Sequence, residues 1–179
     1  MNWADGFKAV AGGNGDNRLY RPNVGICLIN PFGKIWMGKS ESAGPEIVTP
    51  GREWQMPQGG IEETEDIVEA ARRELWEETG IRSAELLDVT KEWWPYDFPP
   101  NYQPVGHKLD PFCGQKQKWV AFNFIGKDAD FDITAEHTGE PQEFLEWRWM
   151  KIEEARSVTV EFKLEQYERV FKVFRRYLT

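Results

Sequence analysis

Three glutamates, Glu74, Glu77 and Glu78, stand at positions i, i+3 and i+4 of one segment. If that segment is helical, their carboxylates share one face, where mutual repulsion destabilises a bare helix by roughly a few tenths of a kcal/mol per pair. A divalent cation would offset this repulsion, because Mg²⁺ and Mn²⁺ prefer hard oxygen ligands. The three residues therefore predict a site for Mg²⁺, for which Mn²⁺ can substitute.

The flanking residues predict the helix that must position these carboxylates. Asp66 can cap its start and Gly80 stands where it would end, which leaves about four turns between them. On this helix Glu74 and Glu78 border the apolar stripe that begins at Ile67. The two carboxylates therefore lie at the rim of the packing face.

The alternative interpretation is that an acidic helix is simply a solvated face, which is the more frequent case. The rim position of Glu74 and Glu78 argues against it here. We expect Glu69 and Arg73, which are four residues apart in the favourable order, to form the ordinary surface pair of such a helix.

The segment from Gly59 to Ile81 also resembles the Nudix box, G-x5-E-x7-R-E-U-x-E-E-x-G-U, in which U is aliphatic. All nine specified positions are filled, by Gly59, Glu65, Arg73, Glu74, Leu75, Glu77, Glu78, Gly80 and Ile81. The resemblance implies hydrolysis of a pyrophosphate linkage in a nucleotide. We expect Arg73 to orient the glutamates, because a guanidinium can bind a carboxylate at two points. Glu65 is expected to support it.

The composition describes one packed domain. With 179 residues, of which 40% are hydrophobic and 29% charged, the chain is long enough for one core and too short for two comfortable ones. We expect a flexible arm at residues 1–19 and one domain at residues 20–179. The net charge of −8 argues against a protein that binds DNA or RNA through its overall field. A polyanionic substrate must therefore meet bound metal or a local basic patch.

The cysteines and the hydropathy of the sequence predict the cellular compartment. Cys27 lies in an apolar run and Cys113 in a turn-like segment, so two free thiols are expected, as in a reducing cytosol. No apolar stretch approaches the ~20 residues of a membrane span, and no signal peptide is recognisable. We expect a soluble, cytoplasmic protein without a membrane partner, and its oligomeric state is left open.

Hydrophobic periodicity predicts the remaining elements. Extended segments are expected at residues 20–30, 35–38, 53–62, 82–96, 115–126 and 141–150. Residues 40–52 and 97–114 are rich in proline, glycine or serine and are expected to be loops, and residues 127–141 a polar connection. Residues 152–179 are expected to form a short and then a longer amphipathic helix. These elements predict an α/β/α sandwich with a mixed β-sheet, the fold that the Nudix resemblance implies.

Outside the box, five pieces are similar to the bacterial RNA pyrophosphohydrolase and dinucleoside polyphosphate hydrolase branch of the family. They are YRPNVG at 20–25, WQMPQGG at 54–60, GQKQKW at 114–119, EFLEWRW at 143–149 and VEFK at 160–163. The box implies the reaction, and these flanking pieces narrow the substrate.

Basic residues in these pieces are candidates for phosphate contacts. Arg21 precedes a proline and could be a solvated residue, but the resemblance favours a contact with a 5′-phosphate. Lys116 and Lys118 flank one residue of an expected strand, so both point to the same face, as a phosphate chain requires.

Three more residues owe their expected roles to the resemblance. Glu143 could be an edge charge, and the resemblance implies a further metal ligand or base from outside the helix. Phe162 and Lys163 could be core and surface residues of the last helix. The functional interpretation stacks a base on Phe162 and brings Lys163 near a phosphate.

Two substrates fit this chemistry: 5′-triphosphorylated RNA, which releases pyrophosphate, and a dinucleoside polyphosphate such as Ap4A, which releases ATP. Glu74 or Glu143 would accept the proton of the attacking water. Two alternatives remain open: a Nudix hydrolase of another nucleoside diphosphate derivative, and an inactive Nudix domain that only binds nucleotide.

Overall fold

The computed structural model describes residues 20–40, 50–99 and 112–179. The expected arm at residues 1–19 lies outside this part of the chain, as do residues 41–49 and 100–111 of the two expected loops. The elements are β1 (Tyr20–Ile29), β2 (Ile35–Ser40), β3 (Trp54–Gln55), β4 (Gln58–Gly60), α2 (Ile67–Thr79), β5 (Ala84–Val89), β6 (Trp94–Asp97), β7 (Gly114–Phe124), the 3₁₀ turn η1 (Asp128–Asp130), β8 (Phe144–Met150), α3 (Ile152–Val158), α4 (Glu161–Val173) and the 3₁₀ turn η2 (Arg175–Tyr177).

The sheet is mixed, as the sequence predicts. Its central pair, β1 and β7, runs parallel over ten residue pairs from Tyr20 opposite Gly114 to Ile29 opposite Asn123. The other strand pairs are antiparallel, and the main path runs β3-β2-β1-β7-β5, with β4, β6 and β8 paired to β1, β7 and β2.

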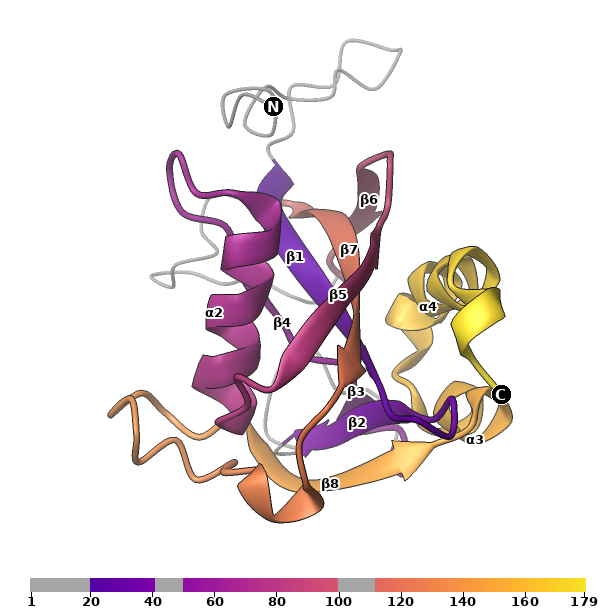
Figure 1. Ribbon diagram of the computed structural model, residues 1–179. Helices are drawn as coiled ribbons and strands as arrows, with labels where there is room; N and C mark the ends of the chain where they lie inside the picture. The colour runs from indigo at the N-terminus through magenta and orange to yellow at the C-terminus, as the bar shows by residue number, and fades with distance from the viewer. Residues whose placement is uncertain (1–19, 41–49, 100–111) are drawn as a thin grey trace, which may run out of the picture.

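Helices cover both faces of the sheet, which confirms the predicted α/β/α layering. Figure 1 shows α2 on one side of the central strands and α4 on the other. Successive residues of β7 alternate between the two cores: Trp119 and Ala121 pack in the α4 layer, whereas Val120 and Phe122 pack in the α2 layer. This period of two is the pattern that predicted the strand.

The segment 82–96, expected as one strand, forms two. The chain bends between β5 and β6 at Thr90, whose N–H donates to the Trp119 carbonyl at 2.9 Å and whose hydroxyl accepts from the Trp119 N–H at 2.9 Å. The hydroxyl thus replaces a backbone acceptor at the bend, and both strands still pair with β7.

The connection at residues 127–141, expected to be polar, also contributes apolar side chains to the core. Phe131 packs against both Trp36 and Trp147, with ring centroids 5.8 and 4.4 Å away, and Ala135 is buried. This segment therefore contributes to the α2 core.

Cys27 and Cys113 are both free thiols, as expected. None of the helices in the described parts of the chain combines the length and the hydropathy that a membrane crossing requires.

Candidate active site

Local capping defines the helix that carries the acidic residues. The Asp66 carboxylate accepts hydrogen bonds from the N–H groups of Val68 and Glu69, at 2.8 and 3.3 Å, and Gly80 ends α2 with a φ of 74°. Both caps are the predicted ones. A side chain at Gly80 would be strained in this left-handed conformation.

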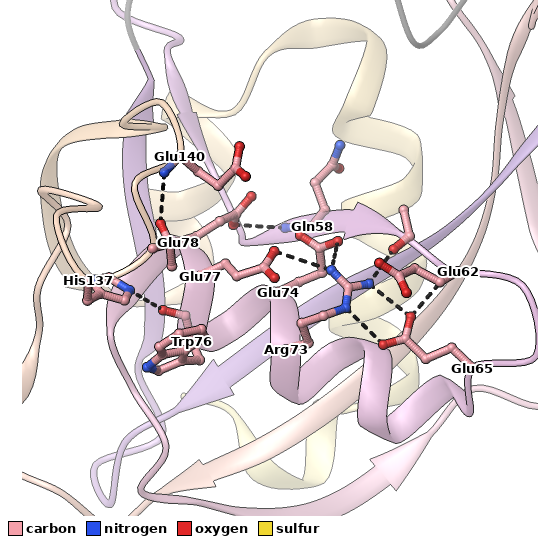
Figure 2. Close-up of polar contacts among 12 residues, drawn as sticks. Gln58, Glu62, Glu65, Arg73, Glu74, Trp76, Glu77, Glu78, His137 and Glu140 are labelled. Atoms are coloured by element: carbon pink, nitrogen blue, oxygen red, sulfur yellow. Dashed lines mark hydrogen bonds and ion pairs between the residues drawn. The ribbon is translucent and has the colours of Figure 1, made fainter.

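Arg73 organises the acidic face of α2. Its Nε and Nη2 donate to the two oxygens of Glu65 at 2.8 and 2.9 Å, and its Nη1 donates to Glu74 at 2.8 Å and Glu77 at 3.2 Å. Nη2 also donates to the Gly60 carbonyl at 2.8 Å. Figure 2 shows this guanidinium among the three carboxylates.

These contacts agree with the expected orienting role of Arg73 and the supporting role of Glu65. The hydrogen bonds to Glu65 raise the pKa of Arg73, and those from Arg73 lower the pKa of Glu65. The expected surface pair of Arg73 with Glu69 is wrong. The loop before α2 returns Glu65 to the guanidinium, and its two-point contact replaces the helical pair.

Two adjacent glycines let other groups approach β4 closely. A Cβ built on Gly59 would lie 1.8 Å from Cδ of Glu74, and one on Gly60 would lie 2.0 Å from Nη2 of Arg21. The absence of side chains at Gly59 and Gly60 therefore admits one acidic and one basic site residue. Burial lowers the pKa of Arg21, an effect that the charge of Glu74 opposes.

The carboxyl group of Glu78 is strongly perturbed by its surroundings. Its carboxylate accepts a hydrogen bond from the Gln58 N–H at 3.2 Å (Figure 2). Burial raises the pKa of Glu78 well above its ordinary value, and the charges of Glu143 and Glu74 raise it further. Glu143, which lies in the segment before β8, therefore acts electrostatically on Glu78 of α2.

The side chains expected to hold the metal are all carboxylates. In the described ranges, no three His, Cys, Asp or Glu side chains lie close enough together to hold an ion. Arg73 instead binds Glu74 and Glu77. The chemistry of the donors still fits a hard divalent cation, because clustered carboxylates that repel one another are stabilised by such an ion. The ligand set of Glu74, Glu77, Glu78 and Glu143 stays a prediction.

The two strand lysines share a face, as expected, but differ in what they bind. Their ammonium groups lie 5.6 Å (Lys116) and 5.8 Å (Lys118) from the centroid of the Trp93 ring. That of Lys118 donates to the carbonyls of Thr90 and Lys91, at 3.1 and 2.7 Å. Lys118 is therefore engaged in holding the bend between β5 and β6.

Phe162 and Lys163 begin α4 on the other side of the site. Phe162 lies 6.1 Å from Tyr96 between ring centroids and lines a cavity of about 350 Å³. The cavity wall also includes Tyr20, Pro95, Asp97, Glu165 and Gln166. Lys163 is only 2% exposed, and its Nζ donates to Oε1 of Gln55 at 2.6 Å. Lys163 is thus a buried residue, not the surface residue of the alternative interpretation.

Sequence reasoning missed the glutamines of the site. Gln117 donates to Asn23 at 2.8 Å and to Gln58 at 3.2 Å, and the Tyr96 hydroxyl donates to Gln115 at 2.5 Å. The available signal was their alternation: Gln115 and Gln117 are two residues apart at the polar start of a strand that becomes apolar. Buried amides at that spacing require partners and so indicate a polar cleft.

Comparisons with known proteins agree with this geometry. The sequence profile of the NUDIX domain matches residues 19–172. An RNA pyrophosphohydrolase of Caulobacter vibrioides is 42% identical over 159 residues, which are 89% of this chain and 88% of the relative. One of Afipia carboxidovorans is 42% identical over 158 residues, 88% of this chain and 93% of the relative.

Solved structures share the fold at low identity. The dihydroneopterin triphosphate pyrophosphohydrolase of E. coli superposes with a TM-score of 0.61 at 16% identity and covers 86% of this chain and 97% of its own. An Ap4A hydrolase of C. elegans gives a TM-score of 0.55 at 16% identity and covers 86% and 98%.

Proposed function

The chain belongs to the NUDIX family of hydrolases, and from this premise we propose that it removes pyrophosphate from 5′-triphosphorylated RNA in a Mg²⁺-dependent reaction. The chain is an enzyme that cleaves a pyrophosphate linkage in a nucleotide or RNA substrate. The choice of RNA is supported by relatives that are about 40% identical over most of both chains and bear the name RNA pyrophosphohydrolase.

One observation carries the proposal: carboxylates from two separate parts of the chain act on one another. Glu74 and Glu78 come from α2, Glu143 comes from the segment before β8, and the charges of Glu74 and Glu143 both act on Glu78. A helix that was only a solvated face would not leave Glu78 half-buried beside two further acids.

Glu74, Glu77, Glu78 and Glu143 would hold the Mg²⁺, and Mn²⁺ could take its place. Bound there, the ion would activate a water molecule and neutralise charge on the polyphosphate. Arg73 holds Glu74 and Glu77 in fixed rotamers before the ion binds, and Glu65 fixes Arg73 in turn.

The proton of the attacking water goes to Glu143 in our proposal. Glu143 is exposed and accepts a hydrogen bond from the neutral amide of Gln55, at 3.2 Å. Oε1 of Glu74, by contrast, is already occupied by the Arg73 guanidinium, so this oxygen is less accessible to a water molecule.

Basic and aromatic residues around the cleft would bind the substrate. We assign Arg21, Lys116 and Lys163 to the phosphate oxygens, and we assign Phe162, whose ring lines the cavity, to a base. We assign Lys118 an indirect part, because its ammonium holds the backbone at Thr90.

A dinucleoside polyphosphate of the Ap4A type is the second candidate substrate. It presents the same polyphosphate to the carboxylates and basic residues of the site. We place the reaction in the cytoplasm, and the free thiols of Cys27 and Cys113 support a reducing compartment.

Parallel assays test the proposal. The protein is incubated with Mg²⁺ and either 5′-triphosphorylated RNA or Ap4A, and kcat/KM and the products are measured. We expect pyrophosphate from RNA with the higher kcat/KM, and a loss of about 100-fold or more in Glu77→Gln and Glu78→Gln. A higher kcat/KM for Ap4A than for RNA would make the dinucleoside polyphosphate the favoured substrate. Failure with both, or unchanged rates in both variants, would overturn the proposal.

A further inference from the structure

Gln55 joins residues from three parts of the chain in one hydrogen-bond network. It lies in β3 with 9% of its surface exposed. Its Oε1 accepts from Nζ of Lys163 in α4, at 2.6 Å. Its Nε2 donates to Oγ of Ser40, at 2.6 Å, and to Oε1 of Glu143, at 3.2 Å.

The chemistry of the partners fixes the orientation of this amide. Lys163 offers only donors, so it must face the amide oxygen, and the Glu143 carboxylate offers only acceptors, so it must face the amide nitrogen. A primary amide can accept from the ammonium through its oxygen and donate to the carboxylate through its nitrogen at once. A flipped amide would place like groups together on both sides.

The backbone around Gln55 holds this amide in place. Gln55 pairs with Gly38 of β2, and the Ser40 N–H donates to the Glu53 carbonyl at 2.9 Å. On the other side, the N–H of Met56 donates to the buried Tyr167 hydroxyl of α4 at 2.8 Å. Gln55 is therefore attached to β2 and α4 by its own chain as well as by its side chain.

We propose that Gln55 is a positioning residue for the hydrolysis: it sets Lys163 for the substrate phosphates and Glu143 for the metal and the proton. The assignment rests on the proposed function for the roles of Lys163 and Glu143. It adds that one neutral amide keeps this cation and this anion apart, so that the two do not neutralise each other by direct pairing.

Double-mutant cycles test this assignment. Gln55→Leu keeps the approximate volume and removes both contacts. We expect it to lower kcat by about 10-fold and to raise KM by about 10-fold. In a Glu143→Gln background the kcat effect should shrink to about 2-fold or less, and in a Lys163→Met background the KM effect should shrink likewise. Equal effects in every background would overturn the proposal, since general loosening of the fold is not specific to these partners.

Ser40→Ala is the matched control. It removes the third partner of the same amide and leaves the contacts to Lys163 and Glu143, so kcat and KM should stay within about 2-fold of wild type. Gln55→Glu is the second variant. It places a carboxylate beside Glu143 and an ion-pair partner beside Lys163, so KM should rise further even if the fold is as stable as wild type.

A readout without substrate separates this proposal from the proposed function. Thermal unfolding is followed during a Mn²⁺ titration of the wild type, Q55L, E143Q and the double variant. We expect Q55L to shift the Mn²⁺ midpoint by about 5-fold or more only where Glu143 is present. A parallel cycle of Q55L with K163M, without metal, should show coupling in melting temperature. If wild type cleaves neither substrate, the proposed function fails alone; if both melting cycles are additive, the role of Gln55 fails.

Discussion

Arg73 and Glu65 form a two-point contact, with Nε to Oε1 at 2.8 Å and Nη2 to Oε2 at 2.9 Å. Because lysine cannot reproduce this geometry, we expect Arg73→Lys to release Glu74 and Glu77 from their fixed rotamers. The variant should lose about 1–3 kcal/mol of unfolding free energy and about 10- to 100-fold in kcat/KM. Urea unfolding and steady-state kinetics measure both.

Arg72→Lys is the control for this substitution. Arg72 is the preceding residue of the same helix and donates from Nη1 to the Ala84 carbonyl at 2.9 Å. The loss should be about 1 kcal/mol or less, with kcat/KM nearly unchanged. Equal effects of the two substitutions would contradict the organising role of Arg73.

The raised pKa of Glu78 predicts a pH dependence of stability in the metal-free protein. The folded-state pKa lies above the ordinary value of 4.5, so its contribution to stability is fully present below that value and is lost as pH rises through the folded-state pKa. Glu78→Gln should remove this loss. We therefore expect a higher melting temperature than wild type at neutral pH in EDTA, and a much smaller stabilisation by Mg²⁺.

Glu69→Gln is the reference for the Glu78 experiment. Glu69 is an exposed acid of the same helix, so its substitution removes the same formal charge outside the site. Its melting profile against pH should follow that of wild type, with or without Mg²⁺. A Glu78→Gln variant that melts below wild type at neutral pH would show that the carboxylate is not strained.

The sequence predicts the elements whose determinants are local. Asp66 and Gly80 delimit α2 because capping depends on residues one to three positions away. The pair of Arg73 with Glu69 was wrong for the opposite reason. Its replacement by Glu65 depends on the path of the loop before the helix, which periodicity does not encode.

For the basic residues and the amides of the site, too, local determinants were predictable from the sequence and long-range contacts were not. Alternation places Lys116 and Lys118 on one face correctly. Alternation cannot show that the carbonyls of Thr90 and Lys91 accept from Lys118. These two residues lie 28 and 27 positions away from it in the sequence. Gln55 escaped notice because its partners come from distant segments.

Gly60→Ala should affect substrate binding through Arg21. The new Cβ would lie 2.0 Å from Nη2 of Arg21, and a flexible side chain yields more readily than backbone. We expect KM to rise by about 10-fold with little change in unfolding free energy. In an Arg21→Ala background the same substitution should have no further effect on KM. An undiminished effect there would locate the cause elsewhere on β4.

Lys118 and Lys116 should respond differently to the same substitution. Lys118→Met leaves two backbone carbonyls without their charged donor, so we expect a loss of about 1–3 kcal/mol in unfolding free energy. Lys116→Met should raise KM with the smaller effect on stability. Unfolding curves and steady-state kinetics of both variants test this difference. A larger loss of stability in Lys116→Met than in Lys118→Met would contradict the separate roles of the two lysines.

Phe162 should distinguish the two candidate substrates. Its ring lines the cavity beside Tyr96, where a base beyond the first nucleotide would stack. Because stacking of one base contributes roughly 1–3 kcal/mol, Phe162→Ala should lower kcat/KM for triphosphorylated RNA by about 10-fold or more, and for Ap4A by less. Phe162→Tyr keeps the ring and serves as the control, with kcat/KM for RNA within about 2-fold of wild type. An equal loss for both substrates in the alanine variant would mean that this ring does not read the RNA beyond its first nucleotide.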